Sequence, residues 1–298
     1  METLGTERNF LGLDEKYSSL DRAGIAIVSA PYEHTVSYGG GTRRGPEAIL
    51  AASHFVEFRD EEFRRELAFD IGIATMAPLE FGSAVDAEAI GIIETQVGAL
   101  LDRDKFVVTL GGEHSISRAP IKAYADRFPD LTVLQIDAHS DLRETYEDSP
   151  WSHACVMARV LEFLPPKQVV QAGIRAQCRE EAERIARDGI QTFFGWEIRQ
   201  GVYGRSWRER VLDACGEHVY ITFDIDGLDP SIMPSTGTPE PGGLFWDETI
   251  QLLKLIGQHR RILGFDLVEL APVEGHPAPD FLAAKLVSKM LNAAFLQR

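Results

Sequence analysis

The feature that most constrains the fold is a series of short apolar runs, rich in β-branched residues, that recurs along the chain. Several of these runs are continuous rather than alternating, which predicts strands buried on both faces, as in a parallel sheet. Helix-like stretches lie between most of the runs, and alternating strands and helices are typical of a doubly wound α/β fold. The expected strands are 24–30, 68–74, 106–110, 131–136, 168–173, 190–194, 218–224 and 261–267. The expected helices include 84–101, 177–188, 203–215, 244–258 and 279–296.

The chain shows no internal repeat, low-complexity tract or Pro/Gly-rich linker that would divide it. We therefore expect a single domain over residues 1–298, a length that suits one large α/β unit. Two loops, at 31–46 and 227–243, are rich in Gly and Pro. Long irregular loops inside a compact domain tend to be functional.

Charge and cysteine content exclude several classes of partner. A net charge of −16 argues against nucleic acid or an anionic membrane as a ligand, and it is compatible with a cationic substrate. The three cysteines are widely spaced and form no CxxC pair, so neither a disulfide framework nor a thiolate zinc site is expected, and a reducing cytoplasm fits. The first ten residues are polar and charged, unlike a signal peptide, and no apolar run approaches the length of a membrane span.

Acidic residues and histidines follow three of the expected strands, in the segments GGEHS, DAHSD and DIDGLDP. The residues concerned are His114, then Asp137, His139 and Asp141, then Asp224 and Asp226. Spacings of two residues in extended chain direct side chains to the same side. Ligands of open α/β sheets bind beyond the carboxyl ends of the strands, so these groups are expected to converge there if the strands are neighbours.

Four carboxylates in one buried cluster would repel one another strongly unless cations neutralised them. An oxygen-rich set with two nitrogens and no sulfur suits manganese or magnesium better than structural zinc. Two such ions hold a shared water and lower its pKa, which makes hydroxide available near neutral pH. Each segment alone could be an ordinary turn, with Asx hydrogen bonds or Asp-Gly punctuation. Their joint placement at three strand ends favours the metal site.

Two further residues are candidates for the chemistry. His153 follows the acidic triplet closely, and Glu269 lies at the end of the last expected strand. His153 could front a helix, or it could shuttle a proton to or from a metal-bound water. Glu269 could be a loop carboxylate, or it could pair with a planar guanidinium through two hydrogen bonds.

Taken in order, GGEHS, DAHSD, SHACV, TFDIDGLDPS, TGTPEPGG and DLVELAP resemble the segments of the ureohydrolases, the family of arginase and agmatinase. These segments run from 111 to 272, and SYGGGTRRGPEAI at 37–49 resembles the family's N-terminal loop. The resemblance implies a three-layer αβα sandwich with an eight-stranded parallel sheet, which agrees with the number of strands expected above. It also implies a homo-oligomer, a trimer or a hexamer.

The resemblance assigns roles residue by residue. The six residues after the strand ends match the family's ligands for two Mn²⁺ ions, with none missing: His114, Asp137, His139, Asp141, Asp224 and Asp226. Asp141 would also hydrogen-bond the bridging hydroxide. His153 matches the proton-handling histidine and Glu269 the glutamate that binds the guanidinium. The implied reaction is attack of hydroxide on the guanidino carbon, with release of urea and a protonated amine.

The loop at 142–152 bears on the substrate, because it reads LRETYEDSPWS and carries three acidic side chains and one arginine. It resembles agmatinases more than arginases, so agmatine is the first choice, with Glu144 a candidate for binding its ammonium group. Aminopropylagmatine, a longer cation, stays open, and arginine and guanidinobutyrate rank lower. Ala154 departs from the glycine usual in the family, which puts the neighbouring pocket wall in doubt.

Two hypotheses from other functional classes remain. Metal-dependent deacetylases share the implied fold but use one zinc ion, and they would not need His114 or the complete second set of ligands. A non-catalytic metal-binding regulator or partner subunit would not need His153 and Glu269 as well. Metal content separates one ion from two, and turnover separates an enzyme from a binder.

Overall fold

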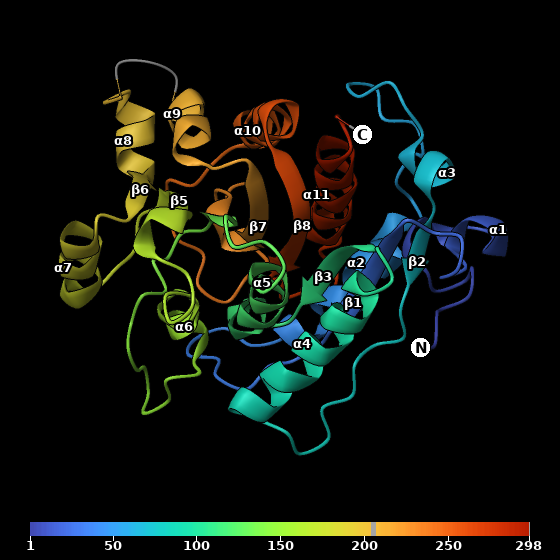
Figure 1. Ribbon diagram of the computed structural model, residues 1–298, viewed down its shortest axis with the longest axis horizontal. Helices are drawn as coiled ribbons and strands as arrows, with labels where there is room; N and C mark the ends of the chain where they lie inside the picture. Colours follow the sequence, from blue (N-terminus) through green and yellow to red (C-terminus); the bar gives the residue numbers. More distant parts are fainter. Residues whose placement is uncertain (204–206, 298) are drawn as a thin grey trace.

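One eight-stranded sheet forms the centre of the computed structural model, which describes residues 1–203 and 207–297 (Figure 1). Its strand order is β2-β1-β3-β8-β7-β4-β5-β6, and all seven neighbouring pairs are parallel. The strands are β1 (Ile25–Ala30), β2 (Ile73–Thr75), β3 (Phe106–Gly111), β4 (Thr132–Ile136), β5 (Val169–Ile174), β6 (Gln191–Phe194), β7 (His218–Asp224) and β8 (Arg261–Val268). The doubly wound parallel sheet expected from the apolar runs is confirmed.

Helices cover both faces of the sheet. One core cluster joins the sheet to α2 (Gly45–Ser53), α9 (Trp207–Ala214), α10 (Trp246–His259) and α11 (Ala278–Ala294). A second cluster joins it to α4 (Asp86–Leu101), α5 (Arg118–Ala125), α6 (Val156–Val160) and α7 (Arg179–Asp188). Figure 1 shows α10 and α11 on one side of the strands and α4 and α5 on the other. The remaining helices are the short α1 (Glu15–Ser18), α3 (Leu67–Ile71) and α8 (Gly195–Gln200).

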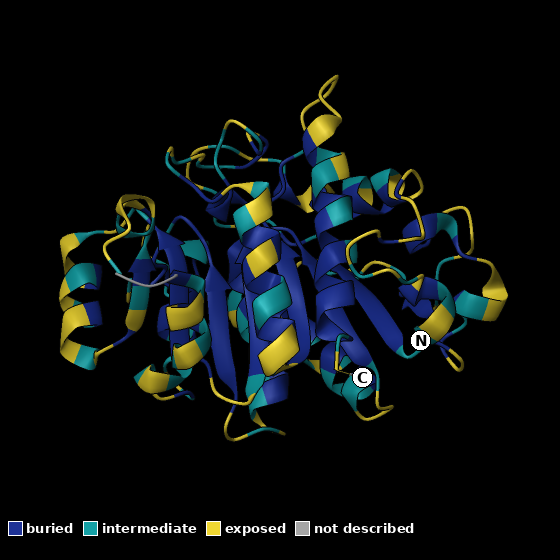
Figure 2. Cartoon of the chain, turned by 90° about the horizontal axis from the view of Figure 1, so that it is seen from above, coloured by how far each residue is buried: buried dark blue, intermediate teal, exposed yellow. Residues whose placement is uncertain are grey.

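The strands are buried between these layers, as Figure 2 shows by its dark blue sheet behind helices with exposed outer faces. Every residue of β1, β3, β4 and β5 is buried. Continuous apolar runs are therefore what this sheet requires, because neither face of its inner strands meets water. At the edge, β6 is only partly buried. Within the described residues, no helix has the length and apolar character needed to cross a bilayer.

The strand expected at 68–74 is wrong over most of its length. Residues 67–71 form α3, and only Ile73–Thr75 pair with β1. Leu67 and Ala68 are buried, and Phe69 packs on Tyr17 with ring centroids 4.9 Å apart. These tertiary contacts select a helical turn in a segment whose apolar content also suits a strand. Gly72, with φ of +76°, separates the two elements. Of the helix expected at 203–215, residues 204–206 lie outside the described part of the chain.

The order of the strands decides where the site forms. In the middle of the sheet, β8 and β7 lie between β3 and β4. All strands are parallel, so their carboxyl ends open at the same edge of the sheet. The residues that follow β3, β4, β7 and β8 therefore share one region above that edge.

Candidate active site

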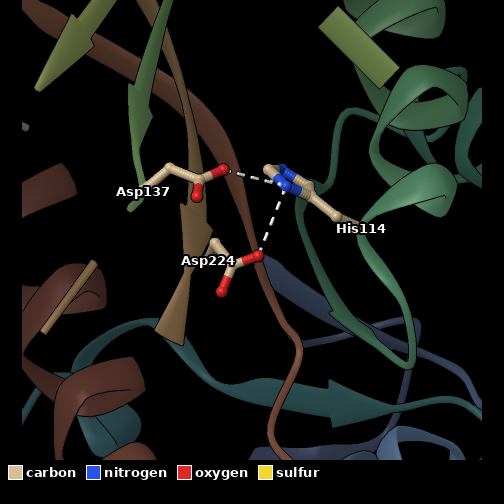
Figure 3. A group of neighbouring side chains, drawn as sticks. All are labelled: His114, Asp137 and Asp224. Carbon is tan, nitrogen blue, oxygen red and sulfur yellow. Dashed lines mark ion pairs between the residues drawn. The ribbon is translucent and has the colours of Figure 1, made fainter. Parts of the chain in front are cut away.

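All six expected ligands meet at this edge, and two histidines organise them into two groups. Three short segments carry them: η3 (His114–Ser117) after β3, the loop at 137–141 after β4, and the end of β7 with the turn η6 (Ile225–Gly227). His114 Nδ1 lies 3.1 Å from an oxygen of Asp137, 2.9 Å from one of Asp141 and 3.4 Å from one of Asp224. Figure 3 shows the carboxylates of Asp137 and Asp224 directed at the imidazole ring.

The second group forms around His139. Its Nδ1 lies 2.9 Å from Oδ2 of Asp226 and 3.7 Å from Oδ1 of Asp137. Asp137 thus offers Oδ2 to the His114 group and Oδ1 to the His139 group. In each of the sets His114–Asp137–Asp224 and Asp137–His139–Asp226, one ligand atom per residue lies within 4.8 Å of the others. A carboxylate shared in this way is the arrangement that bridges two metal ions.

The hydrogen bonds of His114 place its ring proton on Nε2, which leaves Nδ1 free to bind a metal ion. Its Nε2 lies 2.9 Å from the hydroxyl of Thr222, and that hydroxyl donates to Asp266 at 2.8 Å. Because the Thr222 proton is committed to Asp266, Nε2 is the donor and carries the ring proton. The buried Nδ1 has no hydrogen-bond partner among the described residues, although three carboxylates surround it. An unprotonated nitrogen facing carboxylate oxygens fits a cation between them, and a partner that fixes the other nitrogen is typical of metal-binding histidines.

Neither Thr222 nor Asp266 was found by sequence reasoning. A signal was present, since Thr222 precedes Asp224 by two residues and shares its face of β7. Asp266 is a fully buried carboxylate in β8, and its second oxygen accepts a hydrogen bond from Tyr220 at 2.9 Å. Such a residue in an apolar strand needs partners, but the sequence alone does not identify them.

Backbone amides hold the ligand carboxylates in place. Asp226 accepts from the N–H of Ala138 at 3.0 Å, and Asp224 accepts from the N–H of Asp226 at 2.9 Å. Asp137 accepts from the N–H of His139 at 2.6 Å. The Asx turns considered as an alternative to a metal site are thus present, and they are part of the site. In Asp224 and Asp226 the other carboxylate oxygen faces a histidine, and Oδ2 of Asp137 faces His114.

The buried charges of the cluster perturb one another. Burial, and then the negative charge of Asp137, raises the pKa of Asp141 to about 6. Burial and the neighbouring Asp226 raise the pKa of Asp224 well above its ordinary value. Burial acts in the same direction on Asp137, but the neighbouring imidazoles of His114 and His139 outweigh it and lower the pKa of that carboxyl. Divalent cations would relieve this repulsion, so the charge balance fits the same occupants as the geometry.

Glu269 lies beside this cluster on a strained backbone. It follows β8 with φ of +65°, a conformation that non-glycine residues seldom adopt outside functional sites. Two short hydrogen bonds hold it, because its N–H donates to the Gly112 carbonyl at 2.8 Å and its carboxylate accepts from the N–H of His114 at 2.6 Å. Burial and the charge of Glu113 raise its pKa well above the ordinary value. The carboxylate that sequence reasoning selected is therefore in the site.

His153 opens the turn η4 (His153–Cys155) and packs against the loop that follows β1. Its backbone N–H donates to the hydroxyl of Thr35 at 3.0 Å, and its Nδ1 lies 3.3 Å from the same oxygen. The edge of its ring meets Tyr146, with centroids 6.0 Å apart. Cys155, two residues on, is fully buried, and burial raises the pKa of its thiol to about 12, so it is unsuited to act as a nucleophile.

A family model described as the arginase family matches residues 23–292. The chain belongs to the arginase family. Relatives include the N(1)-aminopropylagmatine ureohydrolase of Synechocystis sp., 39% identical over 93% of this chain and 91% of that protein. The agmatinase of Bacillus cereus is 35% identical over 93% of this chain and 94% of that protein. The crystal structure of the agmatine ureohydrolase of Thermoplasma volcanium superimposes with a TM-score of 0.85 and 28% identity, covering 99% of this chain and 94% of that one.

These similarities confirm the ureohydrolase resemblance and the arginase-like αβα fold. The chain is a hydrolase of the arginase family.

In this family member an inner cavity opens directly above the cluster. The cluster residues on its wall are His139, Asp141, Asp224 and Asp226, joined by Glu113, His153 and Glu269. Loop residues 36–39, with Gly237 and Thr238, complete it.

An outer cavity of about 310 Å³ continues from the inner one and shares His139, Asp141 and His153 with it. Its further charged residues are Arg143, Glu181 and Glu240. Ala154 also lines it, so the position that departs from the family's usual glycine adds a methyl group to this wall. The arginase-family site therefore has room beyond the cluster, and its outer wall carries two carboxylates and one guanidinium.

Glu144, a candidate for substrate binding, does not line either of these cavities. Its carboxylate pairs with Arg159 at 2.7 Å and with Arg184 at 2.5 Å, and its side chain is 71% exposed. The sequence shows the charge of the 142–152 loop but not the arginines of other elements that pair with it. Among the residues of that loop, Arg143 and Tyr146 line the outer cavity.

Proposed function

We propose that this arginase-family hydrolase cleaves agmatine to putrescine and urea with two Mn²⁺ ions. The observation that carries the proposal is the sharing of Asp137 between two ligand groups under a cavity lined by His153 and Glu269. Two metal ions that share one carboxylate can activate a water molecule. Beside them, the carboxylate of Glu269 can bind a guanidinium and the imidazole of His153 can carry a proton. The donor set, with oxygen atoms in the majority and no sulfur, supports manganese over structural zinc.

When bound, the two ions would lower the pKa of a water molecule and supply a nucleophile near neutral pH. Glu269 would hold the guanidinium through paired hydrogen bonds and fix its carbon in reach of that nucleophile. Asp141, which lines the cavity, would accept a hydrogen bond from the attacking water. His153 would accept the proton that the water loses and pass it to the departing nitrogen, so that one water and one guanidinium become urea and a protonated amine.

The charges of the cavities support a cationic substrate. Glu113 and Glu269 line the inner cavity, and Glu181 and Glu240 line the outer one, against the single guanidinium of Arg143. Arg143 lies 3.8 Å from Glu181 and stacks over the ring of Tyr146 at 5.0 Å, so protein groups already engage it. A substrate with an ammonium tail therefore fits this wall better than one with a carboxylate tail, which favours agmatine over arginine or guanidinobutyrate.

Aminopropylagmatine is the second candidate. The outer cavity favours it, because that space continues from the inner cavity and is lined by Glu181 and Glu240. The relative from Synechocystis carries the name of this activity. The two cations present the same guanidino group to the site, and they differ only in the length and charge of the tail.

The experiment that tests the proposal measures urea release by the manganese-loaded protein from agmatine, aminopropylagmatine, arginine and guanidinobutyrate in parallel. A preference for agmatine by kcat/KM supports the first candidate, and a preference for aminopropylagmatine the second. Preference for arginine or guanidinobutyrate contradicts the assignment of a cationic tail. If no urea forms from any of the four, other guanidino compounds are tested next, and only their failure favours the regulator or partner-subunit hypothesis.

A variant tests the ligand assignment independently. Asp226→Ala removes the carboxylate next to His139, and we expect fewer bound ions and loss of activity with the fold retained. Metal content is measured by elemental analysis and the fold by circular dichroism. Full metal content with wild-type turnover in this variant contradicts the assignment.

Three further properties belong to the same proposal: one catalytic domain over 1–298, assembly into a trimer or hexamer, and a cytoplasmic location. Size-exclusion chromatography with light scattering determines the oligomeric state, and fractionation of the source cells determines the location. We expect no binding to nucleic acid, because the net charge is −16, and size-exclusion chromatography in the presence of DNA checks this.

A further inference from the structure

The loop that follows β1 is held by a carboxylate that the reaction does not use. Glu113 is almost completely buried and accepts four hydrogen bonds. One oxygen accepts from the backbone N–H groups of His34 and Thr35, at 2.6 and 2.7 Å. The other accepts from the hydroxyls of Thr35 and Ser115, at 2.9 and 2.6 Å. All four partners are donors, so the carboxylate acts here only as an acceptor.

The hydroxyl of Thr35 connects this carboxylate to His153. A hydroxyl has one proton and accepts two hydrogen bonds. The Thr35 proton is directed to Glu113, and one acceptor position takes the backbone N–H of His153 at 3.0 Å. The other acceptor position faces Nδ1 of His153 at 3.3 Å. Because the hydroxyl has no second proton to give, Nδ1 is the donor in a hydrogen bond with Thr35; the hydroxyl of Ser152, at 3.5 Å, is the other group near this nitrogen and is free to rotate as its acceptor.

We propose that Thr35, held by Glu113, is a positioning residue that fixes His153 in the tautomer protonated at Nδ1. This tautomer leaves Nε2 with a free lone pair, and within the described residues no hydrogen bond to Nε2 occurs. Since His153 lines the inner cavity, Nε2 is the nitrogen available to the reacting groups. The inference rests on the proposed function for its kinetic consequence, and on the hydrogen bonds alone for the tautomer. A histidine in the wrong tautomer cannot accept a proton on the side of the reactants.

The direct test compares Thr35→Val with Thr35→Ser, using urea release from agmatine and the other guanidino compounds. Valine has the shape of threonine without the hydroxyl, whereas serine keeps the hydroxyl. We expect Thr35→Val to lower kcat about 10- to 100-fold, because part of the contribution of general acid–base catalysis is lost. Thr35→Ser restores most of kcat, and KM changes little in both variants. A role limited to shaping the loop would instead raise KM, since residues 36–39 line the cavity.

A double-variant cycle separates action through His153 from action elsewhere. In a His153→Asn background, Thr35→Val should cause no further loss of kcat, because the group that it positions is already gone. If the loss caused by Thr35→Val is as large in that background as in the wild type, the proposal is overturned.

Nuclear magnetic resonance tests the tautomer without catalysis. In the full chain loaded with diamagnetic Mg²⁺ and labelled at its histidine nitrogens, we expect Nδ1 of His153 to carry the proton and Nε2 to give the signal of an unprotonated nitrogen. His153→Asn identifies the signals, and Thr35→Val should remove the preference. A wild-type signal with the proton on Nε2 overturns the proposal. If the wild type releases no urea at all, the proposed function fails, whereas this spectrum still decides the tautomer.

Discussion

At the residue scale, Glu269 combines a strained backbone with a carboxylate in the cavity. Glu269→Gln keeps an oxygen for the N–H of His114 but removes the charge that would pair with a guanidinium. A hydrogen bond to a charged group contributes about 1.5–3 kcal/mol, so kcat/KM should fall roughly 10- to 100-fold with metal content unchanged. Steady-state kinetics and elemental analysis measure the two quantities. Glu144→Gln is the matched control, because that carboxylate pairs with Arg159 and Arg184 outside both cavities, and an equal loss in both variants contradicts the assignment.

Thr222 makes a second residue-scale prediction. Its hydroxyl links Nε2 of His114 to Asp266 and thereby sets the tautomer that faces the carboxylates. Thr222→Val leaves the shape but removes the link, and we expect metal affinity to fall about 10- to 100-fold, as for other partners of metal-binding histidines. Thr222→Ser, which retains a hydroxyl, should bind metal nearly as the wild type does. Metal titration followed by calorimetry measures this, and indistinguishable affinities in the valine and serine variants would refute the linkage.

The same residues show how much of the site the sequence contains. The convergence of the six candidate ligands was predictable because each polar group directly interrupts or follows an apolar run, and the runs define one edge of a sheet. The groups that orient them were not predictable. Thr222 and His114 are 108 positions apart, and Thr35 and His153 are 118 apart. A single sequence carries no spacing rule that joins partners brought together only by the folded chain.

At the scale of elements, Arg175 ties the loop at 227–243 to the end of β5. Its guanidinium donates to the carbonyl of Glu240 at 2.7 Å, to that of Asp226 at 2.6 Å and to that of Gly173 at 3.2 Å. Residues of the same loop line both cavities. One side chain therefore joins the turn that carries Asp226, a cavity wall and a strand end.

Replacing Arg175 should loosen this loop. Arg175→Met keeps much of the apolar stem but leaves several carbonyls without a donor, which costs about 1–3 kcal/mol for each one that stays buried. We expect a lower melting temperature, faster proteolysis within 227–243 and a higher KM. Arg175→Lys keeps the charge but not the planar, forked guanidinium, so its melting temperature, proteolysis rate and KM should lie between those of the wild type and of Arg175→Met. Unchanged proteolysis of the loop in Arg175→Met contradicts this role.

Elements were predictable where local pattern and tertiary context agree. Seven of the expected strands match β1 and β3–β8, and apart from the edge strand β6 their apolar runs are buried between the helical layers. At 67–71 the local pattern is ambiguous, and contacts such as that of Phe69 with Tyr17 select a helix. Short apolar segments do not distinguish a helical turn from a strand, because both bury two or three side chains.

At the scale of the whole molecule, the negative charge lies both on the surface and in the interior. The chain has 46 acidic and 30 basic residues, and the field of such a surface raises the local concentration of cations near a cleft. The interior cluster holds carboxylates that burial disfavours. Metal binding and folding are therefore coupled, since cations that bind only the native state stabilise it.

The pH dependence of the metal-free protein should reveal this coupling. For Asp141 the folded pKa of about 6 lies above the ordinary value of 3.8, so the folded state binds more protons between these values. The pKa of His139 is raised to about 12: burial lowers it, but the charge of Asp226 and other carboxylate contacts outweigh that effect. A raised histidine pKa gives stability that is present below about 6.5 and is lost as the pH rises toward 12. The His139 shift makes the metal-free fold more stable as the pH falls from 8 to 6, and the Asp141 shift adds to this only as the pH approaches 6.

We therefore expect chelation to lower the melting temperature at pH 8, and the metal-free protein to gain at least about 2 °C on moving to pH 6. With Mn²⁺ bound, the carboxylates hold ions rather than protons, so the same change of pH should not raise the melting temperature. Calorimetric scans at both pH values, with and without Mn²⁺, measure the difference, and Asp141→Asn in the metal-free protein should reduce it. A metal-free melting temperature that stays flat or falls toward pH 6 would show that the buried carboxylates are neutralised by other means than cations.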